Sequence, residues 1–161
     1  VCAQLADEML RALKFDNKTR ERVVLLVECH DAQLPPRSQV IRRWLNRLGP
    51  EAFFQLLEVK RADGMGQNPE KVRDRLAELD EIRAKAEQIL AEKQCLTLKD
   101  LAVDGRDVIA AGIEPGPEVG KVLEGLLDQV LNGDTMNERE ALISIVIHTL
   151  SEYSNSDGCS H

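Results

Sequence analysis

One dipeptide in the sequence has the chemistry of a metal ligand, His30-Asp31, at the expected end of a helix. An imidazole nitrogen and a neighbouring carboxylate can both bind a divalent ion that activates water for phosphate-ester hydrolysis. Such a site needs further ligands, and the other two histidines, His148 and His161, lie far along the chain and fit no such order. We therefore expect no metal site here and interpret His30 as a helix-end residue stabilised by the helix dipole.

A second candidate is a basic helix face within residues 38–48. Arg42, Arg43 and Arg47 fall on one side of this helix, opposite an apolar side. The apolar side consists of Ile41, Trp44, Leu45 and Leu48. A guanidinium can bind a phosphate through a fork of two N–H donors, so this face predicts contact with two or three phosphates of a nucleic acid. A solvated face, or one that packs on an acidic neighbour, is the alternative interpretation.

The third candidate is the segment 104–121 (DGRDVIAAGIEPGPEVGK), which predicts two helices joined by a tight turn. The pattern resembles a helix-hairpin-helix, a motif that binds nucleic-acid backbone without reading bases. Gly116 and Gly120 would leave backbone amides uncovered at a helix N-terminus, where the dipole favours a phosphate. Lys121, one turn into that helix, and Arg106, near the start of the first helix, would add positive charge.

Local charge opposes this interpretation of the hairpin. Glu114 and Glu118 flank the turn and would repel phosphate, and the glycines could instead permit close helix packing. Residues 1–94 carry 17 Lys and Arg against 16 Asp and Glu, whereas residues 95–161 carry 4 against 12, which gives the net charge of −7. Nucleic-acid modules are usually basic, so any RNA contact must use local basic faces or backbone amides.

Helices are the elements that must position these candidates. Apolar residues recur at helical spacing nearly throughout, no segment alternates with a period of two, and only 3% of the residues are aromatic. Gly49-Pro50 separates two helices, and Gly133 is expected to end the helix at 117–132. Asp16 or Asn17 is expected to cap the second helix, Thr97 to Asp100 resembles a capping box, and Asn137 is expected to cap the last helix. The expected helices cover residues 3–14, 18–30, 38–48, 50 onward, 69–93, a short turn after 97, 105–111, 117–132 and 137–153. The sequence predicts an all-α, multi-helical array.

Length and composition narrow the class further. The 161 residues suffice for one domain or two small ones, and no apolar run approaches the roughly 18 residues of a membrane span. Four cysteines without C-x-x-C spacing predict reduced, mostly buried thiols rather than a zinc site. There is no secretion signal, so we expect a cytoplasmic protein. Because the chain opens inside an expected helix, we also expect it to be part of a longer protein.

Several of these runs, taken in order, resemble bacterial CCA-adding enzymes, the tRNA nucleotidyltransferases of the poly(A) polymerase family. The resemblance extends from about residue 5 to residue 132. The runs are LKFDNKT at 13–19 followed by His30-Asp31, VIRRWLNRLG at 40–49, VKRAD at 59–63, GQNP at 66–69, LKDLAVDG at 98–105 and GPEVG at 116–120.

This resemblance implies that residues 1–62 are the end of an HD-like helical region. Residues 63–161 would be a long helix plus a helical tail domain, with a hairpin-like turn at 112–120. It further implies that a separate N-terminal head holds the catalytic carboxylates, magnesium and CTP or ATP, and nothing in this sequence matches that head. This part would bind no cofactor, would be inactive alone, and would hold tRNA by backbone and shape, with the tail near the TΨC loop. No membrane partner is expected, and the sequence does not define an oligomeric state.

Two alternatives of other classes stay open. The chain could be a fragment of an HD-type metal-dependent phosphohydrolase whose first ligands precede residue 1. It could also be a purely structural helical adaptor that docks or dimerises through the long helix, where Val72, Leu79 and Ala86 repeat every seven residues.

Overall fold

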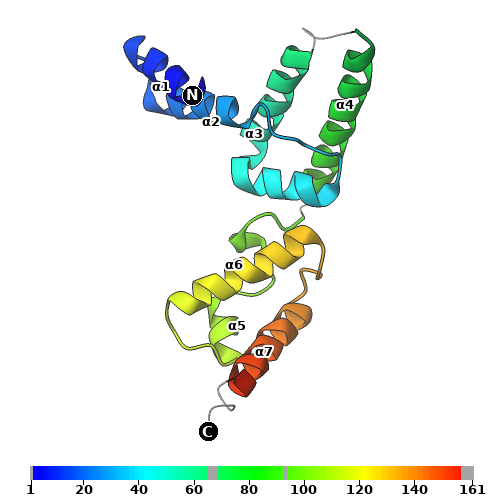
Figure 1. Ribbon diagram of the computed structural model, residues 1–161. Coiled ribbons are helices and arrows are strands. Elements are labelled where there is room, and N and C mark those ends of the chain that lie inside the picture. The colour runs from blue at the N-terminus through cyan, green and yellow to red at the C-terminus, as the bar shows by residue number, and fades with distance from the viewer. Residues whose placement is uncertain (1, 65–68, 93, 157–161) are drawn as a thin grey trace. The chain divides into compact units, whose positions relative to one another are not determined.

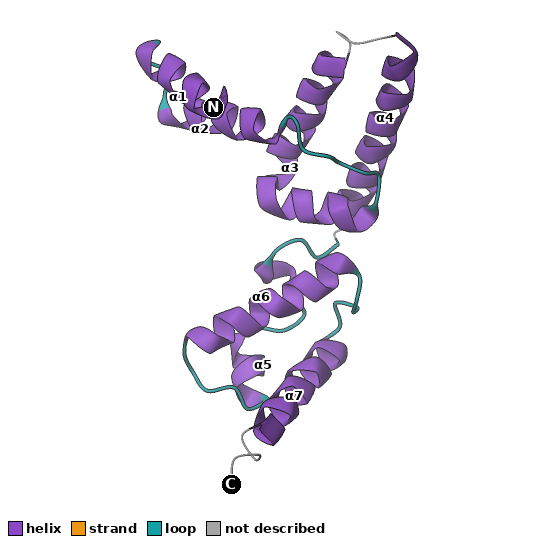
Figure 2. Cartoon of the chain, viewed as in Figure 1, coloured by secondary structure: helices purple, strands orange, loops and turns teal. Residues whose placement is uncertain are grey.

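The computed structural model describes residues 2–64, 69–92 and 94–156, and this part of the chain is helical without any strand (Figures 1 and 2). The all-α prediction is therefore confirmed. The elements are α1 (Cys2–Ala12), α2 (Asn17–Cys29), α3 (Ser38–Gly64), α4 (Pro69–Ala91), the 3-10 turn η1 (Leu98–Asp100), α5 (Gly105–Ala110), α6 (Pro117–Asn132) and α7 (Arg139–Ser156). The sequence predicts a loop at 62–68, whereas α3 continues to Gly64, so residues 62–64 are helical. Residues 65–68 and the polar residues 157–161, including Cys159, lie outside the described residues.

The chain divides into two compact units, Val1–Ala91 and Glu92–His161. The long helix α4 belongs to the first unit because it packs along α3. The sequence places a regional boundary after residue 62, whereas the compact units divide after residue 91. The boundary after residue 62 concerns the regions implied by the resemblance, and it stays a prediction.

The first unit begins with an α1–α2 hairpin and continues into α3 and α4. Asp16 caps α2, as expected, because its carboxylate accepts a hydrogen bond from the amide of Thr19 at 2.9 Å. α3 bends at Gly49, whose φ of 73° suits a glycine, and Pro50 starts the second half of the helix. Helix α3 therefore consists of two segments, as the sequence predicts.

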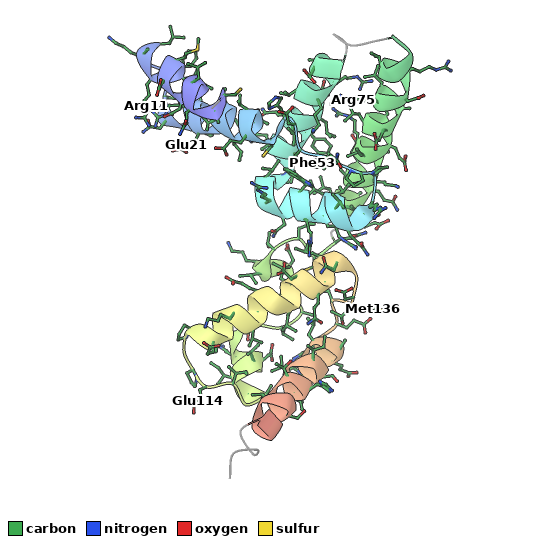
Figure 3. The ribbon with its side chains drawn as sticks, viewed as in Figure 1. Arg11, Glu21, Phe53, Arg75, Glu114 and Met136 are labelled. Carbon is green, nitrogen blue, oxygen red and sulfur yellow. The ribbon has the colours of Figure 1, made fainter. Side chains whose placement is uncertain are left out.

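The core of this unit lies between α3 and α4. Phe53 is fully buried there (Figure 3). From α4, Leu79, Ile82, Ala86 and Ile89 are buried as well. The seven-residue repeat of α4 is therefore largely covered by the chain itself, which leaves less of it for the dimer contact that the adaptor alternative requires.

The second unit packs η1, α5, α6 and α7 around its own apolar core. The buried residues are Cys95, Val103, Leu126, Leu127, Val130, Leu131, Leu142 and Val146. Asp104 caps α5 and Gly133 ends α6 with a left-handed φ of 79°. The Thr97–Asp100 capping box also forms, as the sequence predicts.

The predicted cap of the last helix is wrong. α7 begins at Arg139, and the side chain of Asn137 instead joins two distant parts of the unit. Its amide nitrogen donates to the carbonyl oxygen of Asp100 at 2.7 Å, and its amide oxygen accepts from the backbone nitrogen of Ala102 at 2.8 Å. These longer-range bonds replace the local one that the capping pattern favours.

Candidate nucleic-acid interface

The arginine segment, residues 32–50, is the most basic part of the chain by local sequence. It contains four arginines and no Asp or Glu, within a protein whose net charge is −7. Arg37 lies in the loop before α3, and Arg42, Arg43 and Arg47 lie on the first half of that helix. This stretch is thus a local exception to the acidic character of the whole protein.

Burial of the opposite helix face presents two of these arginines to solvent. Ile41 and Leu45 are 0% and 2% exposed and fix this part of α3 against the core. Arg43 and Arg47 are both exposed and four residues apart, a spacing that makes them neighbours on one helix face. Neither has a carboxylate partner among the described residues. Arg42 is half-buried and already makes contacts within the protein.

Most other arginines of the first unit are, by contrast, neutralised by carboxylates. The pairs are Arg11–Asp7, Arg20–Asp7, Arg22–Glu51, Arg61–Asp80, Arg75–Asp63 and Arg83–Glu58. A guanidinium without an internal carboxylate keeps its donors available for an external anion such as phosphate. This difference distinguishes Arg43 and Arg47 from the paired arginines.

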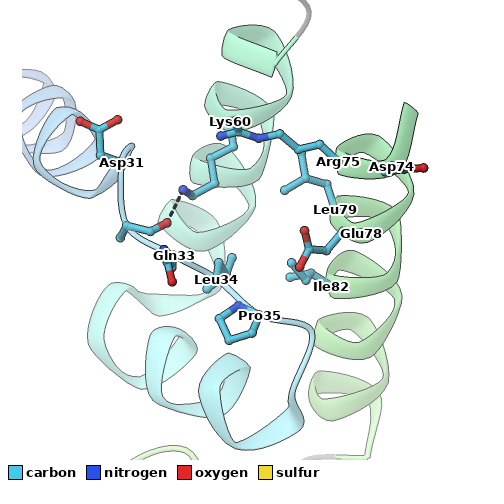
Figure 4. Close-up of a pocket in the computed structure, with 11 residues that line it drawn as sticks. Asp31, Gln33, Leu34, Pro35, Lys60, Asp74, Arg75, Glu78, Leu79 and Ile82 are labelled. Atoms are coloured by element: carbon cyan, nitrogen blue, oxygen red, sulfur yellow. Dashed lines mark hydrogen bonds between the residues drawn. The ribbon is translucent and has the colours of Figure 1, made fainter. Parts of the chain in front are cut away.

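Two lysines hold the loop between α2 and α3, which forms the first part of the arginine segment. Lys60, only 5% exposed, donates from Nζ to the carbonyl oxygen of His30 at 2.7 Å and to that of Ala32 at 2.6 Å. Figure 4 shows Lys60 beside the loop that follows α2. Lys85 on α4 donates to the carbonyl oxygen of Pro36 at 2.6 Å. The end of α2 and the loop are therefore fixed to α3 and α4 by side chains that the sequence analysis did not single out.

A cavity of about 520 Å³ adjoins Lys60, between this loop, α3 and α4. Burial, followed by the positive charge of Arg75, lowers the pKa of Lys60 below its ordinary value. Asp31, Asp74 and Glu78 line the same cavity (Figure 4). With charges of both signs in its wall, the cavity does not favour an anion, and Lys60 acts as a structural donor.

His30 is the C-terminal cap of α2, which places it at a helix end as predicted. Its Nδ1 lies 2.6 Å from the carbonyl oxygen of Val27, and its Nε2 lies 3.2 Å from Oδ1 of Asp31. Both ring nitrogens are thus occupied by protein oxygens. In the described ranges, no three His, Cys, Asp or Glu side chains come together as a metal site. His148 lies on α7 in the other unit, and His161 is outside the described residues.

In the predicted hairpin, close packing involves other glycines than expected. A Cβ atom at Gly105 would lie 3.3 Å from Val119, and one at Gly112 would lie 3.2 Å from Leu150. At Gly116 and Gly120 a Cβ atom would meet nothing within 4 Å. The packing alternative therefore does not explain the two glycines that were selected as amide donors.

The hairpin segment 104–121 is acidic, with two basic residues against four acidic ones, and one of its two positive charges is paired. Lys121 lies 2.7 Å from the Glu118 carboxylate, and the hydrogen bond to Glu118 raises the pKa of Lys121. Arg106 is exposed on α5, and Gly116, the N-cap of α6, provides no side-chain cap. The predicted contact residues thus form two separate groups, one in each unit. The group on α3 has the stronger positive charge.

Comparison with known proteins places the chain in a family. The family model described as "tRNA nucleotidyltransferase domain 2 putative" matches residues 2–146, and the chain belongs to this family. The resemblance identified from the sequence is thereby confirmed.

None of the helices in the described ranges has an apolar stretch long enough to cross a bilayer.

Individual relatives are similar to parts of the chain. A CC-adding tRNA nucleotidyltransferase of Thermus thermophilus is 30% identical over 142 residues, which are 88% of this chain and 31% of that protein. A CCA-adding enzyme of Levilactobacillus brevis is 42% identical over 65 residues, 38% of this chain and 16% of the relative. A CCA-adding enzyme of Limosilactobacillus reuteri is 43% identical over 68 residues, 42% of this chain and 16% of the relative. The chain thus spans less than a third of each of these relatives, and no solved structure matches it significantly.

Proposed function

We propose that this chain is the tRNA-holding part of a nucleotidyltransferase that adds CCA, part of CCA, or adenylates to RNA 3′ ends. The observation that carries the proposal is the family match over residues 2–146, together with relatives named as CCA-adding and CC-adding enzymes. The arginine segment supports it, because the exposed guanidinium groups of Arg43 and Arg47, which have no carboxylate partner among the described residues, suit the phosphates of an RNA backbone. Holding by backbone and shape is also the usual mode of recognition for folded RNA.

The chemistry of nucleotide addition belongs, in this proposal, to a different part of the polypeptide. A head domain would bind magnesium and CTP or ATP, while the helical units described here hold the tRNA. The test is incubation of this chain with tRNA, CTP, ATP and magnesium. We expect no extension of the RNA, and any terminal addition of CMP or AMP would refute the division of labour.

Binding of tRNA by the chain is tested separately, by its dependence on salt. Each phosphate contact contributes about 0.7 to 0.9 to the slope of log affinity against log salt concentration. The double variant Arg43→Gln/Arg47→Gln should therefore lower that slope by about 1.4 to 1.8. The matched control is Arg61→Gln, because the Arg61 guanidinium is already paired with Asp80 at 2.9 Å. Equal slopes in the double variant and the unaltered chain would remove the α3 arginines from the interface.

The same measurements separate the two rival functions. A chain that dimerises in light scattering and binds no tRNA would favour the structural adaptor. An HD-type phosphohydrolase would require a bound metal at His30 and Asp31, which elemental analysis of a longer polypeptide containing this chain would detect. The present contacts of the His30 ring favour neither a metal nor a hydrolytic role.

A further inference from the structure

Arg47 makes a cation–π contact with the single tryptophan of the chain. Its guanidinium carbon lies 5.4 Å from the centroid of the Trp44 ring, three residues earlier on α3. Trp44 is half-buried, at the edge between the apolar face of the helix and the exposed arginines. The sequence analysis assigned Trp44 to the apolar side alone, whereas the structure shows that its ring also carries a charged partner.

A cation–π contact leaves the hydrogen-bonding capacity of a guanidinium available, because the ring attracts the positive charge and accepts none of the five N–H donors in a conventional hydrogen bond. A ring that restricts where the Arg47 guanidinium lies thus favours a forked contact with an oxyanion, a geometry that lysine does not offer. Within the described residues, Arg47 has no carboxylate partner.

A second arginine of the protein also lies over an aromatic ring, but it has a carboxylate partner. The guanidinium carbon of Arg83 lies 5.4 Å from the centroid of the Phe54 ring, and its terminal nitrogen contacts the carboxylate of Glu58. The two arginines therefore share one arrangement, a guanidinium carbon over an aromatic ring at the same distance. They differ in their anionic partner. Arg83 binds the carboxylate of Glu58, whereas Arg47 has no carboxylate partner among the described residues and lies in a segment without Asp or Glu.

We propose that Trp44 is a positioning residue that holds the Arg47 guanidinium ready for a forked contact with one phosphate of the tRNA backbone. This inference rests on the proposed function and names the contact through which the first unit binds its RNA. Trp44 itself touches no RNA in this arrangement. It acts only through Arg47.

A double-mutant cycle tests the proposal on the full 161-residue chain, with tRNA affinity and its salt slope as readouts. Trp44→Leu should weaken binding by about two- to fivefold when Arg47 is present, the range expected from loss of an exposed cation–π contact. The same change should have no effect in the Arg47→Gln background, because Trp44 acts through that side chain. Arg47→Lys, which keeps the charge, should also weaken binding.

Controls separate positioning from folding. Trp44→Phe keeps an aromatic ring and should restore most of the affinity that Trp44→Leu loses. Phe54→Leu removes the ring below the already paired Arg83, so it should leave tRNA affinity unchanged. Thermal unfolding by circular dichroism checks that each variant is folded.

The outcomes distinguish this inference from the proposed function. Absence of any salt-dependent tRNA binding by the unaltered chain would refute the proposed function, and the inference with it. Normal binding by the unaltered chain, with an equal effect of Trp44→Leu in both backgrounds or no effect in either, would overturn only the positioning role.

Discussion

Replacing Lys60 with methionine should destabilise the first unit by about 2 kcal/mol. Lys60 is 5% exposed and donates hydrogen bonds to two carbonyl oxygens, those of His30 at 2.7 Å and Ala32 at 2.6 Å. A buried acceptor without its donor costs about 1 to 3 kcal/mol. We take about 1 kcal/mol for each carbonyl, the lower end of this range, because His30 and Ala32 are only half-buried. The substitution also removes a positive charge that is costly to bury, which offsets part of the loss.

Lys85→Met is the matched control. Lys85 donates to the carbonyl oxygen of Pro36 in the same loop at 2.6 Å, but its side chain is 35% exposed. Water can replace that donor, so the loss should stay below about 1 kcal/mol. Urea unfolding followed by Trp44 fluorescence reports on the first unit, because Trp44 is the only tryptophan. Equal losses in the two variants would refute the argument that burial makes Lys60 important.

The pH dependence of stability gives a second readout for Lys60. Burial and the charge of Arg75 lower the pKa of Lys60 from its ordinary 10.5. Between the lowered pKa and 10.5, the unfolded chain binds a proton that the folded chain has released. The free energy of unfolding of the unaltered chain should therefore rise with pH across this window relative to Lys60→Met. A difference that is flat or falls with pH would contradict the assigned burial.

Three further predictions concern other parts of the chain. Burial raises the pKa of Cys95 to about 11, so only about one Cys95 thiol in a thousand is ionised at pH 8. Alkylation of Cys95, measured by peptide mass mapping, should therefore be far slower than alkylation of the exposed Cys2. Gly49→Ala should lower the free energy of unfolding by about 2 kcal/mol, because the φ of Gly49 is positive. Gly120→Ala should raise it by about 0.5 to 1 kcal/mol, because Gly120 lies within helix α6 and a Cβ atom there would meet nothing within 4 Å. Urea unfolding followed by circular dichroism measures both changes. Asn137→Ala removes two hydrogen bonds and should accelerate hydrogen exchange of the Ala102 amide, which now donates to the Asn137 side chain. Unchanged exchange at Ala102 would contradict this role of Asn137.

Local signals in the sequence predicted most of the fold. Gly133 was identified correctly as a helix end, and Asp16 was one of two expected caps, because a cap depends on its immediate neighbours. Asn137 was misassigned because its actual partners lie 35 and 37 residues away. The burial of Lys60 has no sequence signal, since lysines are nearly always exposed.

The candidate site was predicted less completely than the fold. Helical spacing identified Arg43 and Arg47 as neighbours, but it assigned Trp44 to the core alone. One signal was available and was not used, namely the absence of Asp and Glu from residues 32 to 50. Pairing of the Lys121 charge with Glu118 also required coordinates, because either side chain could have pointed elsewhere.

The separation of the two cores has an evolutionary consequence. Helix α4 ends at Ala91, and the first buried residue of the second core is Cys95, so only a few residues join two independently packed bodies. Insertions or deletions in this joint would leave both interiors intact. Lineages of the family could therefore change the length of this joint without repacking the interior of either body.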